Sequence, residues 1–136
     1  IISGDDTITN PVSYATTSLD TSGVLKYRYE HLAKLDVNIE RNRFSGGFSI
    51  RYNGAMKNID AIFVDPVLFE PLLGTLSSWN RLNKDVTIFD ARIAYDLTEN
   101  SRISFNVDNL FNTEFLLRPA ALGRPRTYSI LYKIVF

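Results

Sequence analysis

The chain has 136 residues, 45% of them hydrophobic, and its 15 basic and 15 acidic side chains leave a formal net charge of zero. This balance excludes the basic footprint of a nucleic-acid-binding protein, and the absence of cysteine excludes disulfides, cysteine–zinc sites and thiol nucleophiles. No run approaches the ~20 apolar residues of a membrane-spanning helix, although the strands of a membrane β-barrel need only about 9–11 residues each.

The first part of the chain passes from an irregular segment to an alternating one. Residues 1–30 are rich in Thr, Ser, Asp, Asn and Gly, and they predict an extracellular loop or a loosely ordered strand end. From residue 31 onward apolar and polar side chains alternate, which predicts strands at about 31–40 and 43–57. A short polar run, Arg41–Arg43, joins them, so we expect a hairpin with a tight connection.

The second part repeats this pattern with longer connections. Residues 58–84 contain two prolines and an apolar patch, and they predict a long loop that is functional or covers another surface. Alternation then predicts strands at about 85–97, 102–111 and 127–136, with a second long loop at 112–126. Five strands are therefore expected, with short turns at one end and long loops at the other.

Each predicted strand has one apolar and one polar face. The rings on the apolar faces fall near strand ends, at Phe44, Tyr52, Phe89, Tyr95, Tyr128 and Phe136. Aromatic belts at both interfaces are typical of outer-membrane barrels. We therefore predict an all-β fold, in which residues 31–136 are the C-terminal antiparallel strands of a large transmembrane β-barrel with long extracellular loops. The alternative is a soluble β-sandwich that uses the same rings as its core.

The unequal connections also predict an orientation. Outer-membrane barrels have short periplasmic turns and longer outer loops, so the C-terminus should lie in the periplasm. Five strands cannot close a barrel, whose minimum is about eight strands. We expect the chain to be the C-terminal piece of a longer polypeptide, cut or numbered afresh within an extracellular loop.

Several short phrases near the end of the chain carry a family resemblance. The residues concerned are Asn109, Leu110, Phe111, Asn112, Gly123, Pro125 and Arg126. The first four close the penultimate strand, and the stretch 123–126 leads into the last one. This pattern resembles the C-terminal end of TonB-dependent outer-membrane receptors. Upstream, Leu25–Arg28, His31, Arg51–Asn53 and Met56–Asp60 resemble the Bacteroidetes branch of that family, so the resemblance covers about 25–136.

The resemblance implies a barrel of about 22 strands with a plugged lumen, which imports a scarce nutrient across the outer membrane of a Gram-negative bacterium. The substrate stays open among siderophores, haem, glycans and peptides. The implied partners are outer-membrane lipids, the rest of the barrel with its plug domain, TonB, and a surface lipoprotein lid. The plug domain and the TonB box belong to the other end of such proteins and are absent from this chain.

Charged residues of both signs share the polar faces of the predicted strands. They are Arg51, Asp90, Arg92, Arg102 and Asp108. In a receptor barrel they would face the lumen, where they either make charge-assisted hydrogen bonds with the plug or solvate a wet interior.

The last strand places its rings and branched side chains on one face. These residues are Tyr128, Ile130, Tyr132, Ile134 and Phe136. They resemble the terminal signal that the barrel-assembly machinery recognises, and β-augmentation is the physical means by which a strand edge could be bound. The same residues would also face lipid.

The long loops hold the candidates for ligand contact, and the sequence contains no catalytic constellation. Arg118 could pair with an anionic group, and Trp79 with Phe69 could stack on a ring, or each could simply pack within its loop. His31 is the only histidine, so we expect no enzyme activity, no metal site and no cofactor. The alternatives to an importer are a barrel subunit for secretion or assembly and a soluble all-β binding module.

Overall fold

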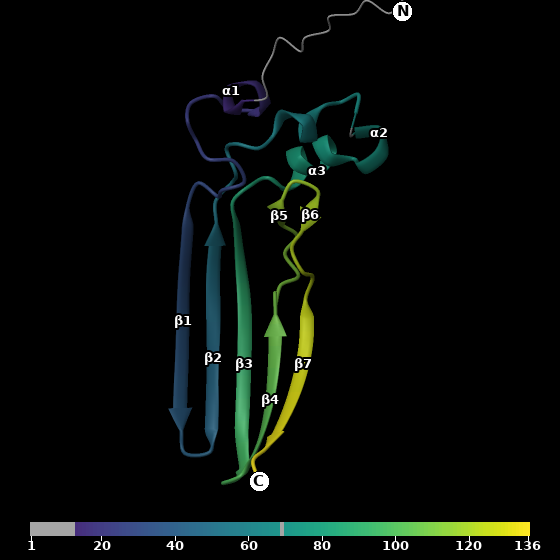
Figure 1. Ribbon diagram of the computed structural model, residues 1–136. Helices are drawn as coiled ribbons and strands as arrows, with labels where there is room; N and C mark the ends of the chain where they lie inside the picture. Colours follow the sequence, from purple (N-terminus) through teal and green to yellow (C-terminus); the bar gives the residue numbers. More distant parts are fainter. Residues whose placement is uncertain (1–12, 69) are drawn as a thin grey trace, which may run out of the picture.

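A computed structural model describes residues 13–68 and 70–136 of the chain. Five long antiparallel strands lie side by side in one sheet, in the order β1-β2-β3-β4-β7 (Figure 1). Their bounds are β1 Leu32–Arg41, β2 Phe44–Asn53, β3 Val86–Thr98, β4 Ser101–Asp108 and β7 Thr127–Ile134. The prediction of an all-β, antiparallel fold is confirmed.

The two ends of the sheet carry different connections. Tight turns join β1 to β2 and β3 to β4 at one end, which we call the turn end (Figure 1). Asn42 adopts a φ of 53° in the first of these turns, a conformation that asparagine tolerates better than most residues. The opposite end, which we call the loop end, carries the long connections and all the short elements. These elements are α1 Tyr14–Thr17, the 3-10 helix η1 Ala61–Val64, α2 Glu70–Leu73, α3 Thr75–Leu82, β5 Leu116–Arg118 and β6 Ala121–Leu122.

Three strands end earlier than their alternation predicts. The strand expected to reach residue 57 ends at Asn53, although pairing with the segment before β1 continues in the same register through the Gly54 N–H, which donates to the His31 carbonyl at 2.8 Å, as far as an isolated bridge between Tyr29 and Met56. The strand expected to reach 111 ends at Asp108, because Asn109 turns into the left-handed region. The last strand ends at Ile134, short of the expected 136.

The two long connections hold more regular structure than their irregular sequences predict. Residues 58–84 include η1, α2 and α3, and residues 112–126 include the β5–β6 hairpin. These elements are short and depend on contacts with one another, so periodicity within each segment is too weak to reveal them.

Strand register brings the predicted apolar faces together into one surface. Phe44 pairs with Tyr95 at the turn end, and Val107 pairs with Tyr128 toward the loop end. This surface stays exposed within the chain, with 43% of Phe48 and 73% of Ile130 accessible. Strands of 8–13 residues match the length that crosses a bilayer core.

The buried hydrophobic side chains of the described residues lie toward the loop end. Met56, Leu82 and Leu116 form one cluster, against which Tyr29 and Trp79 pack. A second cluster joins the start of β3 to the last long connection through Val86, Ile88 and Phe115. Within 13–68 and 70–136, no helix has the length and apolar character needed to cross a membrane.

Candidate functional site

On the polar face of the sheet, one arginine side chain passes over a glycine of the neighbouring strand and bonds to the strand beyond it. The Arg92 guanidinium on β3 donates to Asn38 Oδ1 on β1 from Nε at 2.9 Å and from Nη2 at 2.5 Å. Gly47 on the intervening strand permits this, since a Cβ there would lie 2.5 Å from Asn38 Oδ1 and 3.0 Å from Arg92 Nε. One side chain thus joins three strands.

Three of the other predicted charges of this face, Arg51, Asp90 and Arg102, also have partners within the sheet. The Arg51 guanidinium forms an ion pair with Asp90, with 3.1 Å between Nη2 and Oδ2, and Asp90 Oδ1 accepts the Asn109 N–H at 2.9 Å. Arg102 donates to Ser45 Oγ and approaches Asp96 at 3.5 Å. Register places all five predicted charges on one face of the sheet. All three arginines among them are bonded to other residues of the sheet.

The motif beginning at Asn109 forms the junction between β4 and the last connection. Asn109 is only 3% exposed and has a φ of 53°. Its side-chain Nδ2 donates to the Thr113 carbonyl at 2.9 Å and to the Arg124 carbonyl at 3.0 Å. Its Oδ1 accepts the Thr113 N–H at 2.8 Å. The buried amide is therefore fully hydrogen-bonded, as a buried polar group requires.

The second asparagine of the motif reaches the start of the last strand. Asn112 also has a φ of 53°, and its Oδ1 accepts the Arg126 N–H at 2.9 Å. Between the two asparagines, Phe111 stands 66% exposed with its ring edge-on to Phe89, at a centroid distance of 5.1 Å. The two stretches that carry the family resemblance, 109–112 and 123–126, are thus bonded to each other.

An aromatic ring lies so close to Gly123 that no larger residue fits there. The Gly123 N–H donates to the Phe115 carbonyl at 2.8 Å, and a Cβ at Gly123 would overlap the Phe115 ring. Phe115 in turn is buried against Val86 and Ile88. Ile88 pairs with Arg51 and therefore lies on the polar face of the sheet. The contact between Ile88 and the Phe115 ring holds the last connection over that face.

A hollow of about 350 Å³ opens where that connection meets the wall. Its lining consists of Arg51, Asp108, Asn109, Phe115, Leu117 and Arg124. Arg51 is paired with Asp90, whereas the structure shows no ion pair for Asp108 or Arg124 among the described residues. The hollow therefore presents one carboxylate and one guanidinium that are available to a donor and an acceptor.

A second polar cluster ties the segment after α1 to the chain beyond β2. Asn58 has no exposed surface, and its Nδ2 donates to Tyr14 Oη at 2.7 Å and to the Val24 carbonyl at 2.6 Å. Its Oδ1 accepts the Asp20 N–H at 3.0 Å. The backbone adds further links, including Tyr27 N–H to the Asn58 carbonyl at 2.8 Å. Segment 13–30 is therefore bound to the loop end.

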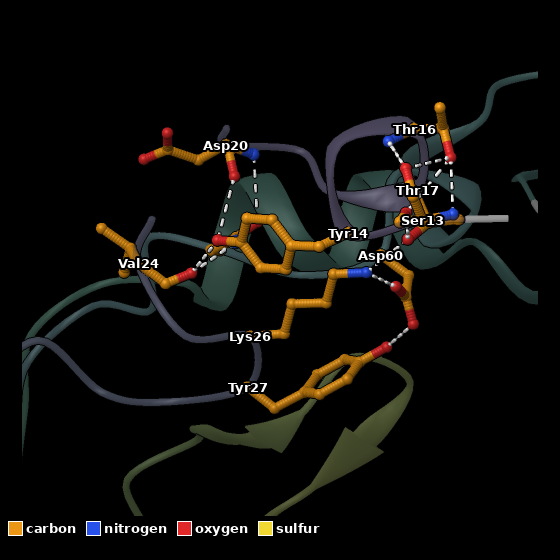
Figure 2. Close-up of polar contacts among 10 residues, drawn as sticks. Ser13, Tyr14, Thr16, Thr17, Asp20, Val24, Lys26, Tyr27 and Asp60 are labelled. Atoms are coloured by element: carbon orange, nitrogen blue, oxygen red, sulfur yellow. Dashed lines mark hydrogen bonds and ion pairs between the residues drawn. The ribbon is translucent and has the colours of Figure 1, made fainter. Parts of the chain in front are cut away.

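Asp60 is the charged centre of this cluster. In Figure 2 its carboxylate lies between Lys26 and Tyr27, which both donate to it. These two donors hold the pKa of Asp60 below its usual value. Burial and the neighbouring Asp60 raise the pKa of Tyr27 to about 12. The Asp60 shift comes first from Lys26 and the Tyr27 shift first from burial, and the hydrogen bond between the phenol and the carboxylate adds to both.

The loop candidates for ligand contact are differently placed. Trp79 lies on α3 and packs against the Met56, Leu82 and Leu116 cluster, whereas Arg118 is exposed on β5. Phe69 lies outside the described residues. No group of three or more His, Asp or Glu side chains suited to a metal ion occurs in the described ranges.

The terminal residues lie as one row along the edge strand. Tyr128, Ile130, Tyr132 and Ile134 share the apolar face of β7, and Phe136 follows the strand fully exposed. Sequence reasoning gave no structural role to three contributors to the loop end, namely Asn58, Asp60 and Phe115, although Met56–Asp60 is among the stretches that carry the resemblance. A period-two pattern carries no signal for them, although the isolated Gly123 before a strand hints at a close approach.

One comparison with solved structures bears on this architecture. The chain is similar to the ferric-catecholate import receptor Fiu from E. coli K12, in its closed form, with a TM-score of 0.58 and 25% sequence identity. The match covers 82% of this chain and 15% of the receptor. No protein-family model and no curated protein sequence matches the chain.

The chain resembles a portion of a TonB-dependent receptor barrel. A barrel wall accounts for an apolar face that stays exposed and for a polar face whose charges bond across strands. The protein that it resembles is an import receptor, and the chain spans only a small part of that receptor's length.

Proposed function

We propose that the chain is the C-terminal wall segment of a TonB-dependent outer-membrane receptor, of the Bacteroidetes type, that actively takes up a scarce nutrient. The observation that carries this proposal is the structural match to an import receptor, which covers 82% of the chain. The sheet that matches has one exposed apolar face. In this proposal residues 31–136 form the wall, residues 1–30 lie outside the cell, and the C-terminus is periplasmic.

The polar face would then line the lumen. Arg51 bonds to the neighbouring strand, and Arg92 and Arg102 each bond to the strand beyond it, which supports a role in stiffening the wall beside the plug domain. Asp108 is free of such bonds among the described residues, so it is the strongest candidate for direct contact with the plug or with solvent. The row from Tyr128 to Phe136 would serve as the terminal signal for barrel assembly while also facing lipid.

The loop end would take part in recognition of the nutrient, whose class is a siderophore, haem, a glycan or a peptide. Arg118 is exposed and available for an anionic group. Trp79 is held in a hydrophobic cluster, which favours a packing role for its ring. The exposed apolar side chains Ile62, Val67 and Leu73 support contact with a neighbouring loop or a surface lipoprotein lid.

Uptake by whole cells tests the proposal. The full-length polypeptide containing these residues is expressed in a receptor-deficient host, with and without functional TonB, and accumulation of labelled ferric siderophores, haem, oligosaccharides and peptides is measured. We expect one class to accumulate only when TonB is present. Accumulation of none, with the protein correctly inserted, would favour a secretion or assembly subunit. A monodisperse protein without detergent would instead identify a soluble binding module.

A further inference from the structure

The connections of the sheet differ in how far they determine strand register. Arg41 pairs with Phe44 and Thr98 with Ser101, so β1–β2 and β3–β4 are held by tight turns. A turn of that length sets register by its own geometry. The pairs β2–β3 and β4–β7 are joined by residues 54–85 and 109–126, and connections of this length impose no register by themselves.

The alternation of apolar and polar side chains does not fully determine the register of β7 against β4. A slip by one residue would move the rings of β7 to the polar face, so alternation opposes it. A slip by two residues keeps Tyr128, Ile130 and Tyr132 on the apolar face, and alternation is indifferent to it. Something besides pattern must select the observed pairing of Asp108 with Thr127.

Side chains at the base of the last connection supply that selection. Asn109, immediately after β4, donates to the Arg124 carbonyl, and Asn112 accepts the Arg126 N–H, immediately before β7. Both bonds run from a side chain on the outgoing limb to the backbone of the incoming limb. They shorten the effective connection to a few residues, so Thr127 can begin only opposite Asp108.

The other long connection is closed in the same manner. Asn83 makes reciprocal bonds with Met56, accepting its N–H at 2.8 Å and donating to its carbonyl at 2.9 Å. Asp85, immediately before β3, accepts the Ala55 N–H at 2.9 Å. The tight turns need no such device, which is consistent with one being present at each long connection.

We propose that Asn109 and Asn112 are register-determining residues, which position the terminal strand against its neighbour, and that Asn83 and Asp85 do the same for β2 and β3. We call each pair of residues a base clasp. The inference requires a sheet of this topology in a membrane barrel and is independent of which nutrient is imported.

Cross-linking in the full-length protein measures register directly. Because these 136 residues contain no cysteine, Asn106→Cys can be combined with Ser129→Cys, its register partner, or with Leu131→Cys, which reports a slip by two. A third pair, Ala94→Cys with Ser104→Cys, joins β3 to β4 and reports general folding. Each pair is made the sole cysteines of the polypeptide and is oxidised in outer-membrane vesicles.

Glycine replacements remove the amides without straining the backbone. Asn109→Gly and Asn112→Gly retain access to the φ of 53° that both positions adopt. We expect the double variant to lower the ratio of the 106–129 to the 106–131 cross-link by about fivefold or more, the change that corresponds to loss of one buried hydrogen bond. The 106–131 cross-link should appear, and the 94–104 cross-link should be unchanged.

Two matched variants test whether the effect is specific. Arg124→Gln changes the side chain but keeps the backbone carbonyl to which Asn109 donates, so it should leave the 106–129 cross-link unchanged. Asn83→Ala removes a comparable pair of bonds from the other clasp, and it should weaken a Ser45→Cys, Ala94→Cys cross-link between β2 and β3 instead.

Two results would overturn the proposal. An unchanged ratio of the 106–129 to the 106–131 cross-link in the double glycine variant would show that register is set elsewhere. An equal fall of the 106–129 and 94–104 cross-links would show a general folding defect, and register would then have no special dependence on the asparagines. Neither result bears on nutrient uptake, which the whole-cell experiment measures separately.

Discussion

The sheet and the loop end are stabilised by different surroundings. The apolar face of the sheet is largely exposed within the chain, so the chain itself does not bury it, and in the proposed barrel lipid would cover it. The loop end instead contains its own hydrophobic clusters and its own polar network. The loop end is therefore packed by residues of this chain, whereas the apolar face of the sheet is not packed by the chain itself. Substitutions at the two ends should differ in size and in what they disturb.

The largest effect should come from Phe115 at the loop end. Replacing this buried ring in Phe115→Ala should lower the free energy of local unfolding of residues 112–126 by about 3–5 kcal/mol, because it empties the cluster with Val86 and Ile88. Native-state hydrogen exchange of the full-length protein measures this quantity. Phe111→Ala is the matched control, since that ring is 66% exposed and makes one edge contact worth at most about 1.5 kcal/mol. Equal costs would contradict an internal core at this end.

A smaller effect should come from Gly47 within the sheet. In Gly47→Ala the new Cβ would meet the Val37 carbonyl at 2.6 Å and displace Arg92 from Asn38, at a cost of about 1–3 kcal/mol. Amide exchange in β1 and β2 reports the loss. Gly46→Ala, on the opposite face, meets a Phe44 ring carbon at 3.3 Å, and that ring can rotate away. If Gly46→Ala and Gly47→Ala had equal effects on amide exchange, the bond from Arg92 to Asn38 would not contribute to the stability of the sheet.

These two sites also mark how far the sequence alone could reach. The faces of the sheet were predictable because alternation is local, and register simply aligned apolar residues such as Phe48 and Ala91 across strands. The resemblance located Asn109 and Gly123, but it did not reveal that one bonds across the loop base and the other lies beneath Phe115.

The interior of the loop end was beyond prediction for a physical reason. Its contacts join distant parts of the chain, as when Tyr29 Oη donates to the Leu116 carbonyl at 2.6 Å. Asn58 lies at the start of a predicted loop, yet it is completely buried because segment 13–30 closes over it and bonds to its side chain at three positions. Such contacts depend on tertiary arrangement rather than on any local period.

The polar cluster around Asp60 should contribute less than Phe115. Asp60→Asn removes the ionised acceptor of Lys26 and Tyr27, and we expect segment 13–30 to open with a loss of about 1–3 kcal/mol. Limited proteolysis between residues 18 and 26 measures the opening. Asp20→Asn serves as control because that carboxylate bonds only the nearby Ser22 N–H, at 2.8 Å. Similar cleavage of both variants would mean that Asp60 does not hold the segment.

The same cluster should respond to pH at both extremes. The lowered pKa of Asp60 means that its contribution is present above the usual aspartate pKa and is lost as pH falls through the lowered value. Tyr27 has the opposite sign, because its pKa is raised from 10.0 to about 12, so its contribution is present below pH 10 and is lost as pH rises toward 12. Protease sensitivity of segment 13–30 should therefore increase at low and at high pH, and the alkaline increase should be smaller in Tyr27→Phe, with the remainder due to Tyr29, whose pKa burial also raises.

The smallest effect should come from the ion pair that joins α3 to the last connection. Arg81 Nη1 lies 2.8 Å from Glu114 Oε2, but both side chains are 63% exposed, so water and salt screen the pair. Arg81→Gln should lower the free energy of local unfolding by only about 0.2–1 kcal/mol, and by less at high salt. Hydrogen exchange at residues 112–126, compared with Phe115→Ala, provides the scale. A loss as large as that of the ring would mean that the loop end is held by surface charge rather than by its internal hydrophobic clusters.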